Sequence, residues 1–181
     1  MHPAWRASFF LFTTFASFPA LACSYPEPPT IRSVLSKASS VFIFRLDHAT
    51  YKRTEFGGGA HTAWVEGSIK LIHNLYGDPT RYRSIKFSTG WCGGVNLVVG
   101  HHYLIATNEL GSEIKLGLSD GTVLDIEGYY NASRKKESVR SIVVWPVVKA
   151  IYGVEPLPAS FPPRFIAERT TVQPPPPPNV D

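Results

Sequence analysis

Most of the chain between residues 40 and 126 alternates apolar and polar side chains, as strands do when they bury one face. Two long runs begin the pattern, SSVFIFRLDHATYKRTE and HTAWVEGSIKLIHNLYG, and three glycines at 57 to 59 lie between them. We expect a long antiparallel hairpin with these glycines in its flexible loop.

Three further segments extend this predicted sheet. RYRSIKFST and HHYLIAT have the pattern of a third and a fourth strand. EIKLGLSDGTVLDIEG holds two alternating runs around Asp120-Gly121, a pair that tolerates the positive φ angles of a tight turn, and so predicts a second hairpin. The result is a mainly β fold of five or six antiparallel strands, and a small closed barrel is the economical way to remove their edges.

Two segments with helical spacing flank the predicted strands. TIRSVLSK places Ile31, Val34 and Leu35 on one face. ESVRSIVVWPVVKAIYG has the same spacing, but its Pro146 should kink the helix or delay its start, and its β-branched residues leave a strand open as the alternative. We therefore expect one or two short helices beside the sheet.

Residues 1–22 have the composition of a secretory signal peptide. Arg6 supplies the positive charge, an apolar run follows, and Ala20-Leu21-Ala22 fits the small-residue cleavage pattern. The apolar run is shorter than the roughly 20 residues that span a bilayer, which argues against a transmembrane anchor. Cleavage would leave Cys23 as the N-terminal residue of a secreted or periplasmic protein.

The same site admits a second kind of processing. In a bacterial lipoprotein, Cys23 would be lipidated and its amine acylated, although Ala20 and Leu21 match that pattern poorly. A lipid-anchored envelope protein is therefore the alternative localisation.

The rest of the chain divides into one domain, residues 23–152, and a proline-rich segment, residues 153–181, that ends in five consecutive prolines at 174 to 178. Such a segment favours extended polyproline II structure and buries little apolar surface, so we expect a disordered tail or spacer.

Net charge gives no sign of a nucleic-acid partner. Without the signal peptide the chain has 17 Lys and Arg against 14 Asp and Glu, a formal charge of +3. The RKK at 134 to 136 has the character of a solvated turn. An OB-type binder of nucleic acid or sugar would need exposed aromatic and basic side chains on one face, and the candidates are Trp64, Tyr82, Lys70, Arg81 and Arg83.

The two cysteines, Cys23 and Cys92, predict one disulfide, because an exported chain with an even count usually pairs them. Closing a loop of about 70 residues contributes about 4 kcal/mol in the chain-entropy account. A zinc site fits less well, since there is no second cysteine pair and the adjacent His101 and His102 would point to opposite faces of a strand. No nucleophile elbow, phosphate loop or carboxylate pair stands out, so we expect a non-enzymatic protein without a metal or cofactor of its own.

Several of these features together resemble a known family. Cys23 with the following SYPEPP, the short helix, the hairpin ending in IHNLYGD, the WCGG and GHHYLIAT segments and the Asp-Gly hairpin are similar to the netrin-like module. The closer resemblance, over residues 23 to 130, is to the N-terminal domain of tissue inhibitors of metalloproteinases and their small bacterial relatives. It implies a five-stranded OB-type barrel with Cys23 bonded to Cys92.

The resemblance also implies a mechanism, in which the α-amine and carbonyl of the N-terminal cysteine bind the catalytic zinc of a target protease. Carried over by position, Cys23 chelates, Ser24 enters the specificity pocket, and the other ridge residues line the cleft. We call this set the N-terminal ridge: Cys23, Ser24, Tyr25, Pro26, Gly90 and Trp91.

The chain departs from the animal inhibitors, because it lacks their further disulfides and their C-terminal domain, and Glu27 places a negative charge near the ridge. The alternative function is accordingly a structural or protein-interaction module of the cell envelope, lipid-anchored through Cys23 and without inhibitory activity.

Overall fold

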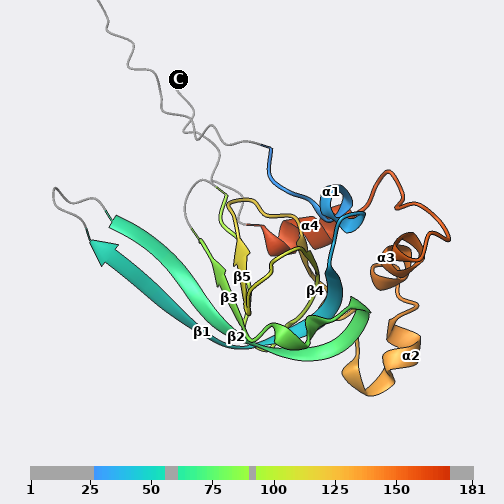
Figure 1. Cartoon of the computed structure of the whole chain (residues 1–181), viewed down its shortest axis with the longest axis horizontal. Coiled ribbons are helices and arrows are strands. Elements are labelled where there is room, and N and C mark those ends of the chain that lie inside the picture. Colours follow the sequence, from blue (N-terminus) through green and yellow to red (C-terminus); the bar gives the residue numbers. More distant parts are fainter. Residues whose placement is uncertain (1–26, 56–60, 90–92, 172–181) are drawn as a thin grey trace, which may run out of the picture.

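A computed structural model of the chain describes residues 27–55, 61–89 and 93–171 (Figure 1). These residues form a mainly β structure, as the alternation predicted, with one sheet that curls into a half-barrel. The strand order is β5-β3-β2-β1-β4-β6. The strands are β1 (Ser40–Glu55), β2 (His61–Gly77), β3 (Ser84–Phe87), β4 (His102–Thr107), β5 (Glu113–Leu116) and β6 (Val123–Asp125).

The predicted long hairpin is confirmed. β1 and β2 pair antiparallel from Ser40 opposite Gly77 to Glu55 opposite His61. Three register shifts along β1 mark β-bulges, which bend and twist the ribbon. β3 pairs with β2 only at residues 65–68, and β4 pairs with β1 only at residues 40–45. The far half of the hairpin therefore projects as an arm (Figure 1), and residues 51–55 on it are exposed. The predicted glycine loop lies outside the described residues.

The predicted hairpin around Asp120-Gly121 is wrong. β5 pairs parallel with β3 and β6 pairs antiparallel with β4, so the two strands form opposite edges of the sheet. Neither residue of the pair has a positive φ angle, which is instead found at Ser119 (54°). The Asp120 carboxylate accepts hydrogen bonds from the backbone, and Gly121 forms a parallel bridge with Thr30. These contacts fasten the segment, which connects the two edge strands, to Thr30.

Aromatic side chains fill the inner face of the sheet. This cluster draws buried residues from all six strands, including Phe42 and Phe44. Phe42 stacks on Tyr82 with ring centroids 5.3 Å apart, and Phe44 stacks on Tyr103 at 5.4 Å. Offset aromatic pairs of this kind add to the stabilisation from burial.

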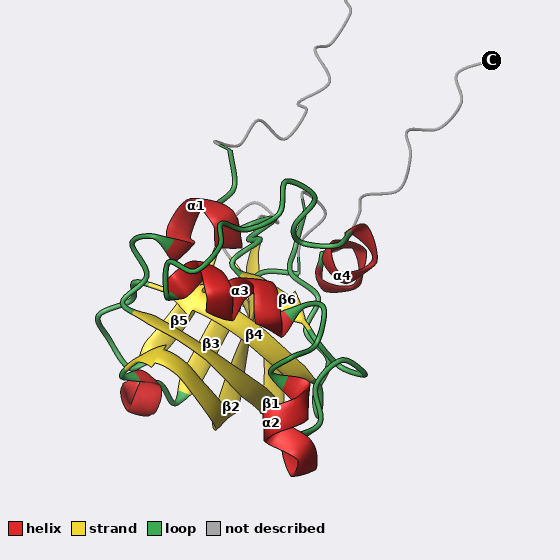
Figure 2. Ribbon diagram, turned by 90° about the vertical axis from the view of Figure 1, so that its right-hand side faces the viewer, coloured by secondary structure: helices red, strands yellow, loops and turns green. Residues whose placement is uncertain are grey.

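Helices cover the outer face (Figure 2). α1 (Ile31–Leu35) was predicted, and it begins with a capping box between Thr30 and Ser33. α3 (Val144–Ile151) starts late, as Pro146 predicted, since proline is tolerated in a first turn. The described residues hold more helices than the one or two expected, because they also contain α2 (Lys135–Ser138), α4 (Arg164–Thr170) and the 3₁₀ turns η2 (Pro79–Arg81) and η3 (Ala132–Arg134).

The expectation of a tail from residue 153 onward is wrong for residues 153–171. Leu157, Phe161 and Ile166 are buried in the outer core, and Ile166 lies on α4. The Asn96 N–H donates to the Thr170 carbonyl at 2.7 Å, which ties the end of α4 to the segment between β3 and β4. The prolines of this stretch do not prevent the apolar residues between them from packing into the core.

The pentaproline run and the predicted signal peptide lie outside the described residues. Within the part that is described, no helix combines the length and the apolar character needed to cross a bilayer.

Candidate functional site

The residues of the N-terminal ridge, and Cys92, all lie outside the described residues. The Cys23–Cys92 disulfide therefore stays a prediction. The described segments that flank these residues can nevertheless be followed, and both lead to residues 117–122, which we call the 117–122 turn.

The segment that follows the predicted N-terminus is fastened to this turn. The Gly121 N–H donates to the Pro29 carbonyl at 2.8 Å, and the Ile31 N–H donates to the Gly121 carbonyl at 2.9 Å. A Cβ atom at residue 121 would lie 3.3 Å from the Pro29 oxygen and 3.4 Å from the Thr30 Cα, so glycine permits the close approach. The chain is thus held in place six residues after Cys23.

The segment that leaves Cys92 is fastened to the same turn. Both the backbone N–H and the hydroxyl of Ser119 donate to the Gly93 carbonyl, the hydroxyl at 3.1 Å. Gly93 has a φ angle of 93°, and an added Cβ would collide with the Ser119 hydroxyl oxygen. Both conditions favour glycine at residue 93.

A buried carboxylate holds the turn itself. Asp120 is 5% exposed, and its two oxygens accept from the Gly117 N–H at 3.1 Å, the Thr122 N–H at 2.9 Å and the Thr122 hydroxyl at 2.6 Å. A buried network in which each member has a partner is rigid. Six extended residues span about 20 Å, which is the greatest distance that the chain from Pro29 back to residue 23 can cover.

A second polar centre joins β4, β6 and α4. His101 Nδ1 lies 3.0 Å from Asp125 Oδ2, and His102 Nδ1 lies 2.8 Å from Glu127 Oε2, so each histidine has its own carboxylate. Asp125 is buried, and its N–H donates to the Thr170 hydroxyl at 2.8 Å. Among the described residues, no three side chains of the His, Cys, Asp and Glu types lie close enough to hold a metal ion. This cluster attaches α4 to the sheet.

The pKa values of Glu127 and His73, in this part of the molecule, are displaced. Partial burial would raise the pKa of Glu127, but hydrogen bonds from the His102 ring and N–H, with the charges of both histidines, hold it below its usual value. Burial lowers the pKa of His73, and the charge of Lys135 lowers it further. The His73 ring also lies 3.0 Å from the Tyr130 hydroxyl.

The side chains proposed for an OB-type binder of nucleic acid or sugar do not form one binding face. Tyr82 is 1% exposed and its hydroxyl donates to the Glu109 carbonyl, so its ring cannot stack on a ligand. Trp64 donates to Glu66 at 2.7 Å, and the Lys86 ammonium lies 4.5 Å from its ring centre. The aromatic platform that such binding needs is therefore taken up by internal contacts.

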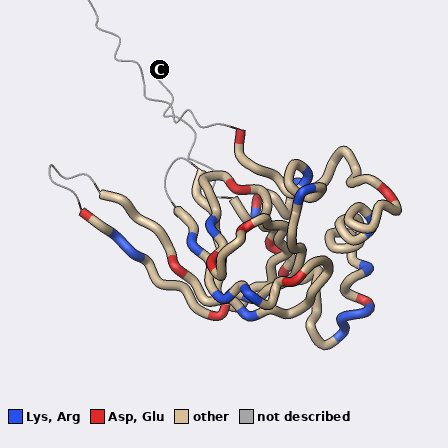
Figure 3. The backbone as a smooth tube through the Cα atoms, viewed as in Figure 1, with Lys and Arg blue, Asp and Glu red and all other residues tan. Residues whose placement is uncertain are grey.

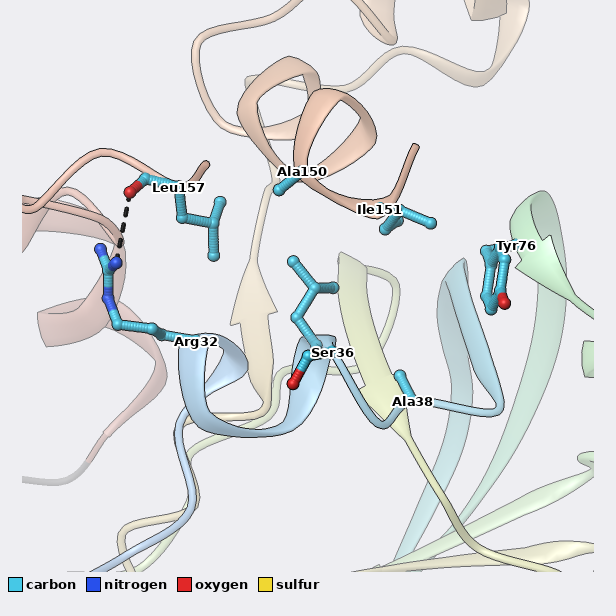
Figure 4. A pocket seen from close by; sticks show the side chains of 8 residues that line it. Arg32, Ser36, Ala38, Tyr76, Ala150, Ile151 and Leu157 are labelled. Atoms are coloured by element: carbon cyan, nitrogen blue, oxygen red, sulfur yellow. Dashed lines mark hydrogen bonds between the residues drawn. The ribbon is translucent and has the colours of Figure 1, made fainter. Parts of the chain in front are cut away.

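A cavity of about 260 Å³ opens between α1, the end of α3 and the end of β2 (Figure 4). The Arg32 guanidinium donates to the carbonyls of Leu157, at 3.2 Å, and Pro158. The other lining residues are mostly apolar: Leu35, Ala38, Tyr76, Ala150 and Ile151, with Ser36 beside them. Arg32 thus fastens the segment after α3 to α1.

Comparison with known proteins adds no relative. A scan of the chain against models of protein families gave no match, and a search of curated proteins found none either.

The two cysteines were visible in the sequence, whereas the roles of Gly93 and Ser119 were not. The Asp-Gly-Thr at 120 to 122 was a usable signal, because an aspartate that accepts from the N–H two residues later forms an Asx turn.

Proposed function

We propose that the chain is a secreted, non-enzymatic binding module that blocks a zinc metalloprotease through the free amine and carbonyl of Cys23. The observation that supports this proposal is the convergence of both flanks of the N-terminal ridge on the 117–122 turn. That turn brings the chain after Cys23 and the chain after Cys92 to neighbouring residues, as a disulfide between these cysteines requires.

The proposed mechanism uses ordinary coordination chemistry. The α-amine nitrogen and the carbonyl oxygen of one residue form a five-membered chelate with the target's zinc and displace the water that would attack substrate. Ser24 would enter the specificity pocket, with the remaining ridge residues along the cleft. A disulfide that fixes the terminus lowers the entropy lost on binding.

The proposed fold is an OB-type, netrin-like barrel. The 117–122 turn connects β5 to β6, the two edge strands of the described sheet, and the inner core takes residues from every described strand. Both features are compatible with a barrel that the turn helps to close.

The exposed arm of the β1–β2 hairpin favours a second candidate, a structural or protein-interaction module of the cell envelope. Residues 51–55 project beyond the rest of the sheet and offer a surface to a partner protein. Acylation of Cys23 would select this function, because an acylated amine has no lone pair to give to zinc.

The first experiment is the intact mass of the exported protein before and after reduction. A species that begins at an unmodified Cys23 and gains two hydrogens on reduction is expected. It would then be tested against a panel of zinc proteases beside a variant with one extra alanine ahead of Cys23, which should lose inhibition while keeping its fold. A diacylglyceryl and N-acyl mass, or equal behaviour of both proteins, would refute the zinc mechanism.

A further inference from the structure

Residues 134–145, which we call the 134–145 segment, form consecutive helical turns on the outer side of the molecule (Figure 2). The Val139 N–H donates to the Lys135 carbonyl, and the Trp145 N–H donates to the Ser141 carbonyl, both at 3.0 Å. Val143 and Val144 are fully buried and attach the inner side of the 134–145 segment to the core. Its outer side is therefore presented to solvent on a fixed support.

The outer side of the 134–145 segment is strongly basic. Lys135, Lys136 and Arg140 are exposed, and Figure 3 shows cations gathered on α2. The RKK at 134–136, which was expected to be a solvated turn, thus has a fourth cation, Arg140, on the same segment.

The sheet adds two cations to the same side. Arg45 and Lys70 are direct partners in the β1–β2 register, and Arg45 also pairs with His102 of β4. A hollow of about 530 Å³ connects Arg45 to Ser138 at the end of α2. We call these six cations the basic face: Arg45, Lys70, Arg134, Lys135, Lys136 and Arg140.

The basic face carries the whole charge excess of the protein. The acids beside it are Asp47, Glu127 and Glu137, each of which pairs with a residue of this region. Six cations against three acids leave +3, and the other eleven cations and eleven acids of residues 23–181 cancel. Within the described chain, Lys70 and Lys136 have no acidic group within 4 Å. The charge is therefore available to an outside partner.

Two large exposed apolar side chains follow Arg140 on the same segment of the chain. Ile142 is 63% exposed and Trp145 is 40% exposed, although Val143 and Val144 between them are buried. A soluble polyanion gains little from such side chains. A lipid surface gains from both features, because its anionic headgroups attract cations and its interface accepts tryptophan and aliphatic side chains.

We infer that the basic face, with Ile142 and Trp145, attaches the protein peripherally to membranes that contain anionic lipid. The cations contact phosphate-bearing headgroups, and the two apolar side chains enter the interface. This attachment uses neither the N-terminal ridge nor acylation of Cys23, so it stands apart from the proposed inhibition.

Sedimentation with vesicles tests the inference, using the unacylated protein that begins at Cys23. Binding is expected to vesicles of phosphatidylcholine with phosphatidylglycerol, to be weak for phosphatidylcholine alone, and to fall as sodium chloride rises. The K135Q/K136Q/R140Q variant should bind about 100-fold more weakly, at about fivefold for each cation. The matched control is K37Q/K52Q/K115Q, which removes three exposed lysines elsewhere and should bind as the wild type does.

A second variant separates a membrane from a soluble polyanion. I142S/W145S should bind the anionic vesicles about tenfold more weakly while its retention on heparin is unchanged. Equal vesicle binding by this variant and the wild type would instead indicate a soluble polyanion and overturn the inference. Equal loss in the two triple variants, or equal binding to both lipid compositions, would also overturn it. Protease inhibition, measured separately, should be the same in all of these variants.

Discussion

Replacing Gly93 by alanine adds one methyl group where the chain that leaves Cys92 meets the 117–122 turn. The φ angle of 93° is unfavourable for any residue with a Cβ, which costs about 1–2 kcal/mol. The new Cβ would also collide with the Ser119 hydroxyl oxygen, and turning that hydroxyl away would break its hydrogen bond to the Gly93 carbonyl, which costs about 1 kcal/mol. The lower entropy of the unfolded alanine chain returns about 0.5–1 kcal/mol. The free energy of unfolding should therefore fall by about 1–2.5 kcal/mol.

The chain contains a matched control for the backbone contribution. Gly100 has a φ angle of 92°, and an added Cβ there would meet nothing within 4 Å. Gly100→Ala therefore measures the cost of the positive φ angle alone. The difference between the two variants measures the collision with Ser119.

Urea unfolding followed by far-UV circular dichroism would give these free energies, with Ser119→Ala completing a double-mutant cycle. Ser119→Ala alone should cost about 1 kcal/mol for its hydrogen bond to Gly93. In that background Gly93→Ala should cost about as much as Gly100→Ala, because the remaining neighbours, the Ser119 Cβ at 3.4 Å and N at 3.8 Å, are at ordinary contact distances. If Gly93→Ala costs no more than Gly100→Ala in the wild-type background, the close approach of Gly93 to Ser119 is refuted.

Three further variants test other parts of the structure. Ile166→Ala should lower the free energy of urea unfolding by about 2–4 kcal/mol because Ile166 is fully buried, whereas Arg164→Ala on the same helix should change it by less than about 0.5 kcal/mol; equal effects would contradict the folding of α4 onto the core. Glu127→Gln should destabilise the protein at pH 7, and since the pKa of Glu127 is held below its usual value near 4.3, the gap from wild type should narrow as the pH falls below about 5; a gap that is the same at pH 7 and pH 3 would contradict this reading. Lys135→Gln should raise the pKa of His73 in an NMR titration, and an unchanged pKa would contradict the position of Lys135 near His73.

Local periodicity was enough to predict the long hairpin and α1, because their patterns depend on residues that are near in sequence. Thr30 and Ser33, for example, form the cap of α1 within four residues. The prediction of a hairpin at Asp120-Gly121 was wrong for the opposite reason. Its conformation depends on Pro29 and on strands at the two ends of the sheet, and no short window of sequence contains those partners.

The composition of residues 153–171 was misleading in a different way. Proline removes N–H donors and fixes φ angles, which argues against regular structure, but it does not prevent packing. Phe161 and Ile166 reach the outer core between the prolines, and Arg32 of α1 holds the carbonyls of Leu157 and Pro158. The same limit applies to the candidate site, where the cysteines stand out in the sequence but the residues that position their flanks do not.

The position of the 117–122 turn connects the stability of the fold to the proposed function. In the proposed mechanism a terminus that merely reached a target's zinc would lose much of its freedom on binding, and this loss weakens affinity. The turn reduces the loss, because Gly121 holds the chain after Cys23 and Ser119 holds the chain after Cys92. The turn also joins the two edge strands, so the same buried Asp120 network supports the described sheet and the segments that flank the ridge. Variants that loosen the turn should therefore speed dissociation from a target at temperatures where the barrel is still folded.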